Sequence, residues 1–114
     1  MNLHAPLVPE HDADMHLVLC DFGRAGSAYV ETDPSEADQA TIVRNLLEGQ
    51  YERPQQVIAF NSAEGWCRDV SEDIAGRVLQ TAERDHRTLS EGTRDFVERQ
   101  LGADSVPRAL VDAE

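Results

Sequence analysis

The sequence predicts a small α+β domain with a three-stranded mixed sheet and three helices packed on it. Short apolar runs bounded by turn residues indicate strands, and amphipathic stretches that begin with capping residues indicate helices. These elements follow one another as strand, strand, helix, strand, helix, helix, and a chain of 114 residues fits one domain. We expect this domain to span residues 15–102, between a flexible N-terminal arm at 1–14 and a flexible C-terminal tail at 103–114.

The first two strands are predicted at 16–22 and 27–32, and together they form a hairpin. The first run, H-L-V-L-C-D-F, is apolar on both faces, which is typical of a central strand. Gly23 and Gly26 can adopt the positive φ that a tight turn between the strands requires. The triplet D-F-G in this stretch also occurs in protein kinases, but the chain has no lysine and no kinase-type glycine-rich or catalytic loop.

The first helix has the most complete set of local signals. Asp33 is expected to be its N-cap, Pro34 occupies the first helical position, and Glu36 closes a capping box. Apolar residues then recur at helical spacing until Gly49, so the helix is predicted to end near Glu48.

The third strand is predicted around the apolar run 57–60, and residues 61–68 are expected to turn the chain into a second helix. Asp69 is the expected cap of this helix, and Ser71 is a competing cap. A capping box at 88–91 begins the third helix, which ends at Gly102. The connection from the second strand through the first helix to the third strand is long enough for a right-handed crossover. These two strands are therefore predicted to be parallel neighbours.

The predicted sheet needs cover on both sides, because two of its strands are apolar on both faces. The first two helices can cover one side. The third helix, the terminal segments or a second copy of the chain must cover the other side. On this ground we expect a homodimer.

The charge of the chain disfavours several classes of partner. The net charge is −12 and all ten basic residues are arginines, so the chain repels phosphate backbones and anionic lipid surfaces. We expect no binding to nucleic acid and no association with membranes. A protein partner with a basic or neutral surface suits this charge, and a phosphate-like row of acids on one face would instead indicate nucleic-acid mimicry.

The cysteines and the N-terminal residues indicate a cytoplasmic protein. Cys20 and Cys67 lack the spacing of a zinc or disulfide motif, so we expect free thiols in a reducing compartment. Residues 1–14 have neither the basic start nor the apolar run of a signal peptide. No apolar stretch reaches the length of a membrane span.

Polar and aromatic residues gather where the second and third strands are expected to end. Because the carboxyl ends of parallel strands meet at one edge of a sheet, we expect one cleft or partner surface there. Its candidate members are Asp33, Asn61, Glu64, Trp66, Cys67 and Arg68. The oxygen atoms of these side chains suit a divalent metal ion, but their spacing matches no known metal-binding motif. Whether the site binds a metal ion is therefore undecided from the sequence, and no cofactor is expected.

Two of these candidates also have individual interpretations. Cys67 would precede a helix N-terminus, which can lower the pKa of a thiol, but no histidine is close in sequence to act as its base. Trp66 belongs to the residue types that are enriched at the energetic centres of protein interfaces.

Two segments carry a resemblance: D-F-G-R-A-G-S-A-Y-V-E-T-D at 21–33 and F-N-S-A-E-G-W-C-R-D-V-S-E-D at 60–73. Together they resemble a group of short bacterial proteins to which no activity is attached. The resemblance covers roughly the middle two thirds of the chain, residues 16–99. It implies a bacterial origin and assigns a role to no residue.

The function expected from these observations is that of a noncatalytic, dimeric interaction or regulatory protein, because no complete catalytic constellation is present. The alternative is an enzyme that depends on a small ligand or a divalent metal ion. Its cleft would use Asp33, Asn61, Glu64 and Arg68, where polar groups converge at the carboxyl edge of the sheet.

Overall fold

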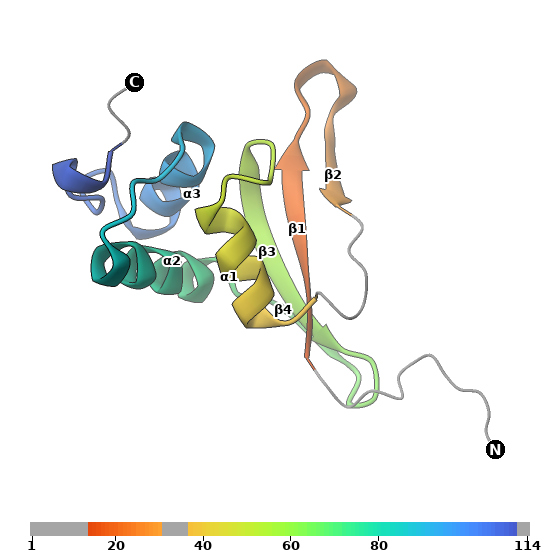
Figure 1. Ribbon diagram of the computed structural model, residues 1–114. Coiled ribbons are helices and arrows are strands. Elements are labelled where there is room, and N and C mark those ends of the chain that lie inside the picture. The colour runs from red at the N-terminus through yellow and green to blue at the C-terminus, as the bar shows by residue number, and fades with distance from the viewer. Residues whose placement is uncertain (1–13, 31–36, 112–114) are drawn as a thin grey trace.

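The computed structural model describes residues 14–30 and 37–111, and within them the chain folds as an α+β domain with a four-stranded antiparallel sheet (Figure 1). The strand order is β2-β1-β3-β4. The main elements are β1 (Met15–Asp21), β2 (Ser27–Val30), α1 (Gln39–Leu47), β3 (Pro54–Asn61), β4 (Trp66–Asp69), α2 (Ser71–Asp85) and α3 (Glu91–Leu101). The α+β class, the three predicted strands and the three helices are confirmed, whereas β4 was not predicted.

The predicted parallel pairing between the second and third strands is wrong. β1 lies between β2 and β3 and pairs antiparallel with both, so that Val18 is opposite Val30 on one side and Val57 on the other. β2 and β3 do run in the same direction, but they are not neighbours. Pairing with β1 gives β3 a ladder over residues 54–60, which is longer than the described residues of β2 could provide.

The fourth strand occupies the last three residues, 66–68, of the turn predicted at 61–68. The chain reverses between Asn61 and Trp66, where Gly65 has a φ of +76° and its N–H donates to the carbonyl of Asn61 at 2.8 Å. β4 then pairs with β3, with Cys67 opposite Phe60. The strand escaped prediction because W-C-R-D is short and largely polar, and it is partly or fully exposed along its length.

The core lies between one face of the sheet and the helices. Side chains on this face of β1 and β3 alternate with those on the other, so that His16, Val18 and Cys20 are buried while Leu17 and Leu19 are only partly buried. β3 has the same alternation. The helices contribute the other half of the core, including Ile42, Leu46, Ile74, Val78, Phe96 and Val97. Within the described part of the chain, the second face of β1 and β3 is therefore only partly buried.

Helix α1 begins later than predicted and ends where predicted. Its N-cap is Asp38, whose carboxylate accepts hydrogen bonds from the Thr41 hydroxyl at 2.7 Å and the Thr41 N–H at 3.1 Å. These bonds hold the pKa of Asp38 below its usual range. The predicted cap, Asp33, lies outside the described residues. The helix ends at the C-cap Glu48, followed by Gly49 with a φ of +70°.

The later helices begin close to the predicted positions. α2 begins at Ser71, after the N-cap Val70, and Asp69 accepts from the Ser71 N–H at 2.8 Å without being the cap itself. α3 has Ser90 as its N-cap and ends before Gly102. The flexible tail expected from 103 differs from the structure: Val106 and Leu110 are buried, and Val111 forms a parallel bridge with Leu89. Burial of these two apolar side chains and the hydrogen bond from the Leu89 N–H to the Leu110 carbonyl at 2.8 Å hold the segment on the core.

Candidate functional site

Five of the six predicted site residues belong to the β3–β4 hairpin, and the sixth, Asp33, lies outside the described residues. Asn61 ends β3, and Glu64 lies in the turn. Trp66, Cys67 and Arg68 belong to β4. The arm predicted at 1–14 also lies outside the described residues, apart from Asp14. The hairpin therefore unites the candidates by local connection rather than through the predicted parallel edge.

Asn61 holds the hairpin together from within. Its side chain is buried, with 2% of the residue exposed. The amide Nδ2 donates to Asp14 Oδ1 at 3.2 Å, and Oδ1 accepts from the Glu64 N–H at 2.9 Å. These contacts tie the start of β1 to the turn and orient the turn, a structural role that engages both ends of the amide.

Glu64, Trp66 and Arg68 contact one another on the surface of the hairpin. The indole Nε1 of Trp66 donates to Glu64 Oε1 at 2.8 Å. The guanidinium carbon of Arg68 lies 4.7 Å from the centroid of the Trp66 ring, which is a cation–π contact. An acid, an aromatic ring and a cation thus form one small surface cluster. Because the carboxylate and the ring are already engaged, the cluster suits a preformed partner contact better than proton transfer.

Cys67 points away from this cluster, because side chains alternate along a strand. It is exposed and lies within β4 rather than before a helix, so the predicted activation by a helix N-terminus is wrong. It borders a shallow depression of about 490 Å³ whose other members include Leu17, Ile58 and Phe60. The second cysteine, Cys20, is buried, and desolvation is the main cause that raises the pKa of its thiol. A raised pKa makes that thiol unreactive.

The described residues contain no group of three His, Cys, Asp or Glu side chains that could hold a metal ion. Three side chains of the types that bind metal ions have hydrogen-bond partners within the protein instead. Glu64 accepts from Trp66, Asp69 Oδ2 accepts from Gln56 Nε2 at 2.8 Å, and the buried His16 makes a hydrogen bond of 2.9 Å from Nδ1 to the carbonyl of Ala37.

We expect the stability of the protein to fall at acid pH, with a measurable contribution from Asp69. Burial raises the pKa of this carboxyl, but hydrogen bonds from Ser71 and Gln56 outweigh it and the pKa is lowered. A folded-state pKa below the unfolded value of about 3.9 stabilises the protein above that pH. The contribution is lost as the pH falls through the folded-state pKa. Urea midpoints at pH 6 and pH 3 would measure the loss.

The matched variant for this prediction is Asp69→Asn, which keeps an acceptor for the Ser71 N–H and removes the titration. Its midpoint should fall less between the two pH values than the midpoint of the wild type. Other carboxyls titrate in the same range, so the difference between the two losses isolates Asp69. An equal loss in both proteins would contradict the prediction.

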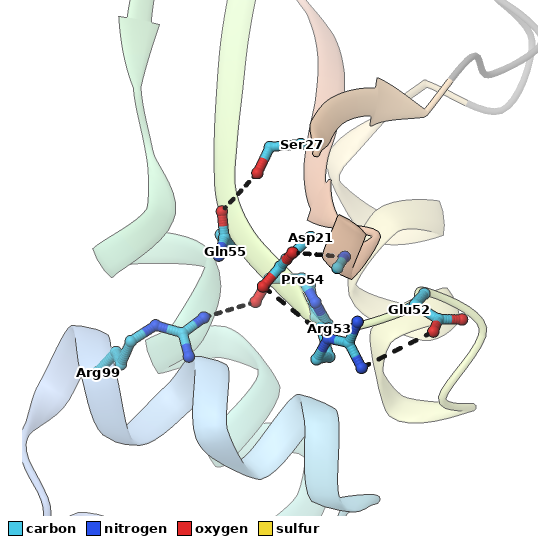
Figure 2. Close-up of polar contacts among 8 residues, drawn as sticks. Asp21, Ser27, Glu52, Arg53, Pro54, Gln55 and Arg99 are labelled. Atoms are coloured by element: carbon cyan, nitrogen blue, oxygen red, sulfur yellow. Dashed lines mark hydrogen bonds and ion pairs between the residues drawn. The ribbon is translucent and has the colours of Figure 1, made fainter. Parts of the chain in front are cut away.

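A second polar cluster lies at the opposite end of the sheet, where β1 ends and β3 begins (Figure 2). Asp21 accepts from the Gly23 N–H at 2.8 Å, and its second oxygen lies 3.9 Å from Arg53 Nε. Arg53 itself has a φ of +38°, which is unusual for a residue with a side chain. From α3, Arg99 donates to the carbonyl of Pro54 at 2.7 Å.

This cluster fastens the hairpin of β1 and β2 to the start of β3 and to α3. The ion-pair partner of Asp21 is Arg53, which precedes β3, rather than the arginine of its own turn, Arg24. Sequence reasoning missed the contact because residues 21 and 53 meet only when β3 pairs with β1. The polar groups are engaged with one another and with the backbone, so we assign the cluster a structural role.

Comparison with known protein families, curated proteins and solved structures gives no significant match to this chain. Within the described residues, α1, α2 and α3 all fall short of the length and apolar character that crossing a bilayer requires. A function is therefore inferred from the chain's own residues.

Proposed function

We propose that this is a noncatalytic interaction protein that self-associates as a homodimer through the face of its sheet opposite the helices. We call this surface the open face. It consists of Met15, Leu17 and Leu19 of β1, Tyr29 of β2, Ile58 and Phe60 of β3, and Cys67 of β4. Its apolar side chains remain partly exposed although the opposite face of the same strands is buried, and this observation carries the proposal.

The registers of the strands place the side chains of the open face in continuous rows. Met15 is opposite Phe60, which is opposite Cys67. Leu17 is opposite Ile58 in the next row. Cross-strand neighbours in such rows share one face, so they form one apolar surface rather than scattered residues.

Charge explains why two copies would meet at this face. Each copy carries a net charge of −12, so association brings two strongly negative molecules together. The rows of the open face are uncharged in their middle, and their acids lie at the margins: Asp69 on the edge strand, opposite Ile58, and Asp21 at the end of β1. Contact through this surface therefore buries apolar area while keeping most carboxylates apart.

The size of the open face is consistent with a modest dimer. The four strands have seven, four, eight and four residues, and each residue covers about 3.4 Å along its strand and about 4.8 Å across it. The projected area is about 375 Å², and side chains raise the accessible area above this value. A standard interface buries about 800 Å² per partner, so we expect a dimer that dissociates on dilution.

Analytical ultracentrifugation between about 1 µM and about 1 mM tests the dimer, because this range spans the affinities of modest interfaces. The wild type should change from monomer to dimer as the concentration rises. Ile58→Glu should remain a monomer with unchanged circular dichroism, because its carboxylate would face the partner surface. Thr88→Glu adds the same charge at an exposed site away from the open face and should still dimerise.

Two outcomes would overturn the proposal. One is a wild type that stays monomeric over the whole range. The other is an equal shift of the dimerisation constant in both charged variants, because this would show an effect of net charge alone. The alternative enzyme at Asp33, Asn61, Glu64 and Arg68 has less support, because the side chains of Asn61 and Glu64 already have hydrogen-bond partners. Two free cysteines support a cytoplasmic location for the dimer.

A further inference from the structure

A groove between α1 and α2 gathers arginines in an otherwise acidic protein. The two helices lie side by side in Figure 1, and the space between them holds about 370 Å³. We call it the arginine groove and define it by Arg44, Arg77, Arg84 and Arg87 with Val43 and Leu47. It belongs to the helix layer and shares no residue with the open face.

The local charge of the groove opposes the charge of the whole molecule. Four of the ten arginines line it, and Asp85 is the one acid among its lining residues, so four positive charges and one negative charge give +3. The whole chain carries −12. Such a reversal favours an anion at this place, where the nearest charges are positive.

The single acid in the groove is already engaged. Arg84 contacts both oxygens of Asp85, at 2.9 Å from Nε and 3.3 Å from Nη2. The side chains of Arg44 and Arg77 make no hydrogen bond or ion pair with any described residue within 4.0 Å, so their donors are available. A planar guanidinium with free donors can hold an oxyanion through two parallel hydrogen bonds.

Helix dipoles explain part of this arrangement but not all of it. Arg44 lies in the last turn of α1 and Arg84 in the last turn of α2, where positive charge is favourable. Arg77 lies in the middle of α2, where the dipole gives no such preference. The dipole also gives no reason for side chains of two separate helices to border one groove.

The floor of the groove indicates what kind of anion fits. Val43 and Leu47 are almost fully buried, at 8% and 7% exposure, and form an apolar base. Thr81 and Gln80 add a hydroxyl and an amide beside the arginines. The volume lies in the range of small-molecule sites. A long nucleic acid would extend beyond the groove onto the acidic remainder of the surface, whereas a compact anion would not.

We propose that the arginine groove binds a small organic anion with at least two negative charges on oxyanion groups, as in a phosphate-bearing metabolite. The guanidinium groups of Arg44 and Arg77 hold the oxyanions, and Val43 and Leu47 contact the organic part. Binding at this site is independent of the proposed dimer, because it uses the other side of the sheet.

Titration with pyrophosphate, followed by ¹H–¹⁵N correlation spectra at constant ionic strength, tests the site. Saturable shifts should concentrate in α1 and α2. In the double variant Arg44→Gln/Arg77→Gln the affinity should fall about tenfold or more, because two charge-assisted contacts are lost. The control Arg24→Gln/Arg108→Gln removes the same charge from two short 3₁₀ turns outside the groove and should leave the affinity within about twofold.

A second variant tests the direction of the effect. Asp85→Asn removes the one acid from the groove and releases Arg84, so pyrophosphate should bind about two- to fivefold more tightly. Citrate replaces pyrophosphate in a parallel titration and distinguishes carboxylate from phosphate recognition. Shifts that do not saturate, or an equal loss of affinity in the groove variant and its control, would overturn the proposal. Arg44, Arg77 and Arg84 are exposed and Arg87 is partly buried, so the variants of the arginine groove should fold.

Discussion

Replacing Phe96 with alanine lowers the free energy of unfolding by about 3–5 kcal/mol, the range for removal of a buried aromatic side chain. Phe96 is fully buried and is the largest of the fully buried side chains. It belongs to the core that joins α3 to the other helices and the sheet. A domain of this kind has a total stability of about 5–15 kcal/mol, so the variant should lose a large share of it.

Urea denaturation followed by circular dichroism measures this loss. Phe22→Ala is the matched control, because Phe22 is 40% exposed and its removal opens no core cavity. The control should change the free energy of unfolding by about 0.5 kcal/mol or less, as is usual at the surface. If the two variants lost similar amounts, the placement of α3 on the core would be wrong.

Replacing Ser71 with alanine should have the second largest effect, a loss of about 1–3 kcal/mol from the free energy of unfolding. The buried hydroxyl of Ser71 accepts from the Val57 N–H at 2.8 Å and donates to the Val57 carbonyl at 3.3 Å. Ile58, the next residue, is opposite Asp69 at the end of β4. Ser71 therefore continues the ladder of β3 by one position after β4 ends, and alanine leaves a buried N–H without a partner.

Hydrogen exchange gives this prediction a local measurement. In Ser71→Ala the Val57 amide should exchange faster relative to the other amides of β3, since it loses the acceptor that protects it. Ser62→Ala, in the exposed turn of the hairpin, is the control and should leave Val57 protected as in the wild type. Unchanged protection of Val57 in Ser71→Ala would show that water or another group replaces the hydroxyl.

Local chemistry predicted the helix ends well and one helix start poorly. Gly49 and Gly102 ended α1 and α3 as expected, because a glycine after an apolar stripe is a signal contained in a few residues. Asp33 was predicted to cap α1, whereas the observed N-cap is Asp38, a residue of the same type and the same capping chemistry. The observed cap follows the buried Ala37, whose carbonyl bonds to His16. That contact joins segments far apart in the sequence.

The strand pairing and the contacts of the candidate site also depend on residues that no single local motif contains. β3 pairs with β1 rather than β2, and no local motif encodes this choice between two strands far away in the sequence. The hairpin candidates lie together because they are neighbours in sequence, and not because parallel strands meet at one edge of the sheet. Their contacts with one another, such as Trp66 with Glu64 and Arg68, decide what they can do. The arginine groove was missed because its charges come from two helices that each look like ordinary solvated faces.

The central position of β1 has a consequence for synthesis on the ribosome. β1 emerges first and can form a hairpin with β2 at once, but its other edge must wait for β3. Met15 pairs with Phe60, 45 positions later in the chain (60 − 15 = 45), so a long loop must close before that edge is covered. Until then the nascent chain presents an unpaired strand edge with apolar side chains, a feature that attracts other unfolded chains and the chaperones that shield them.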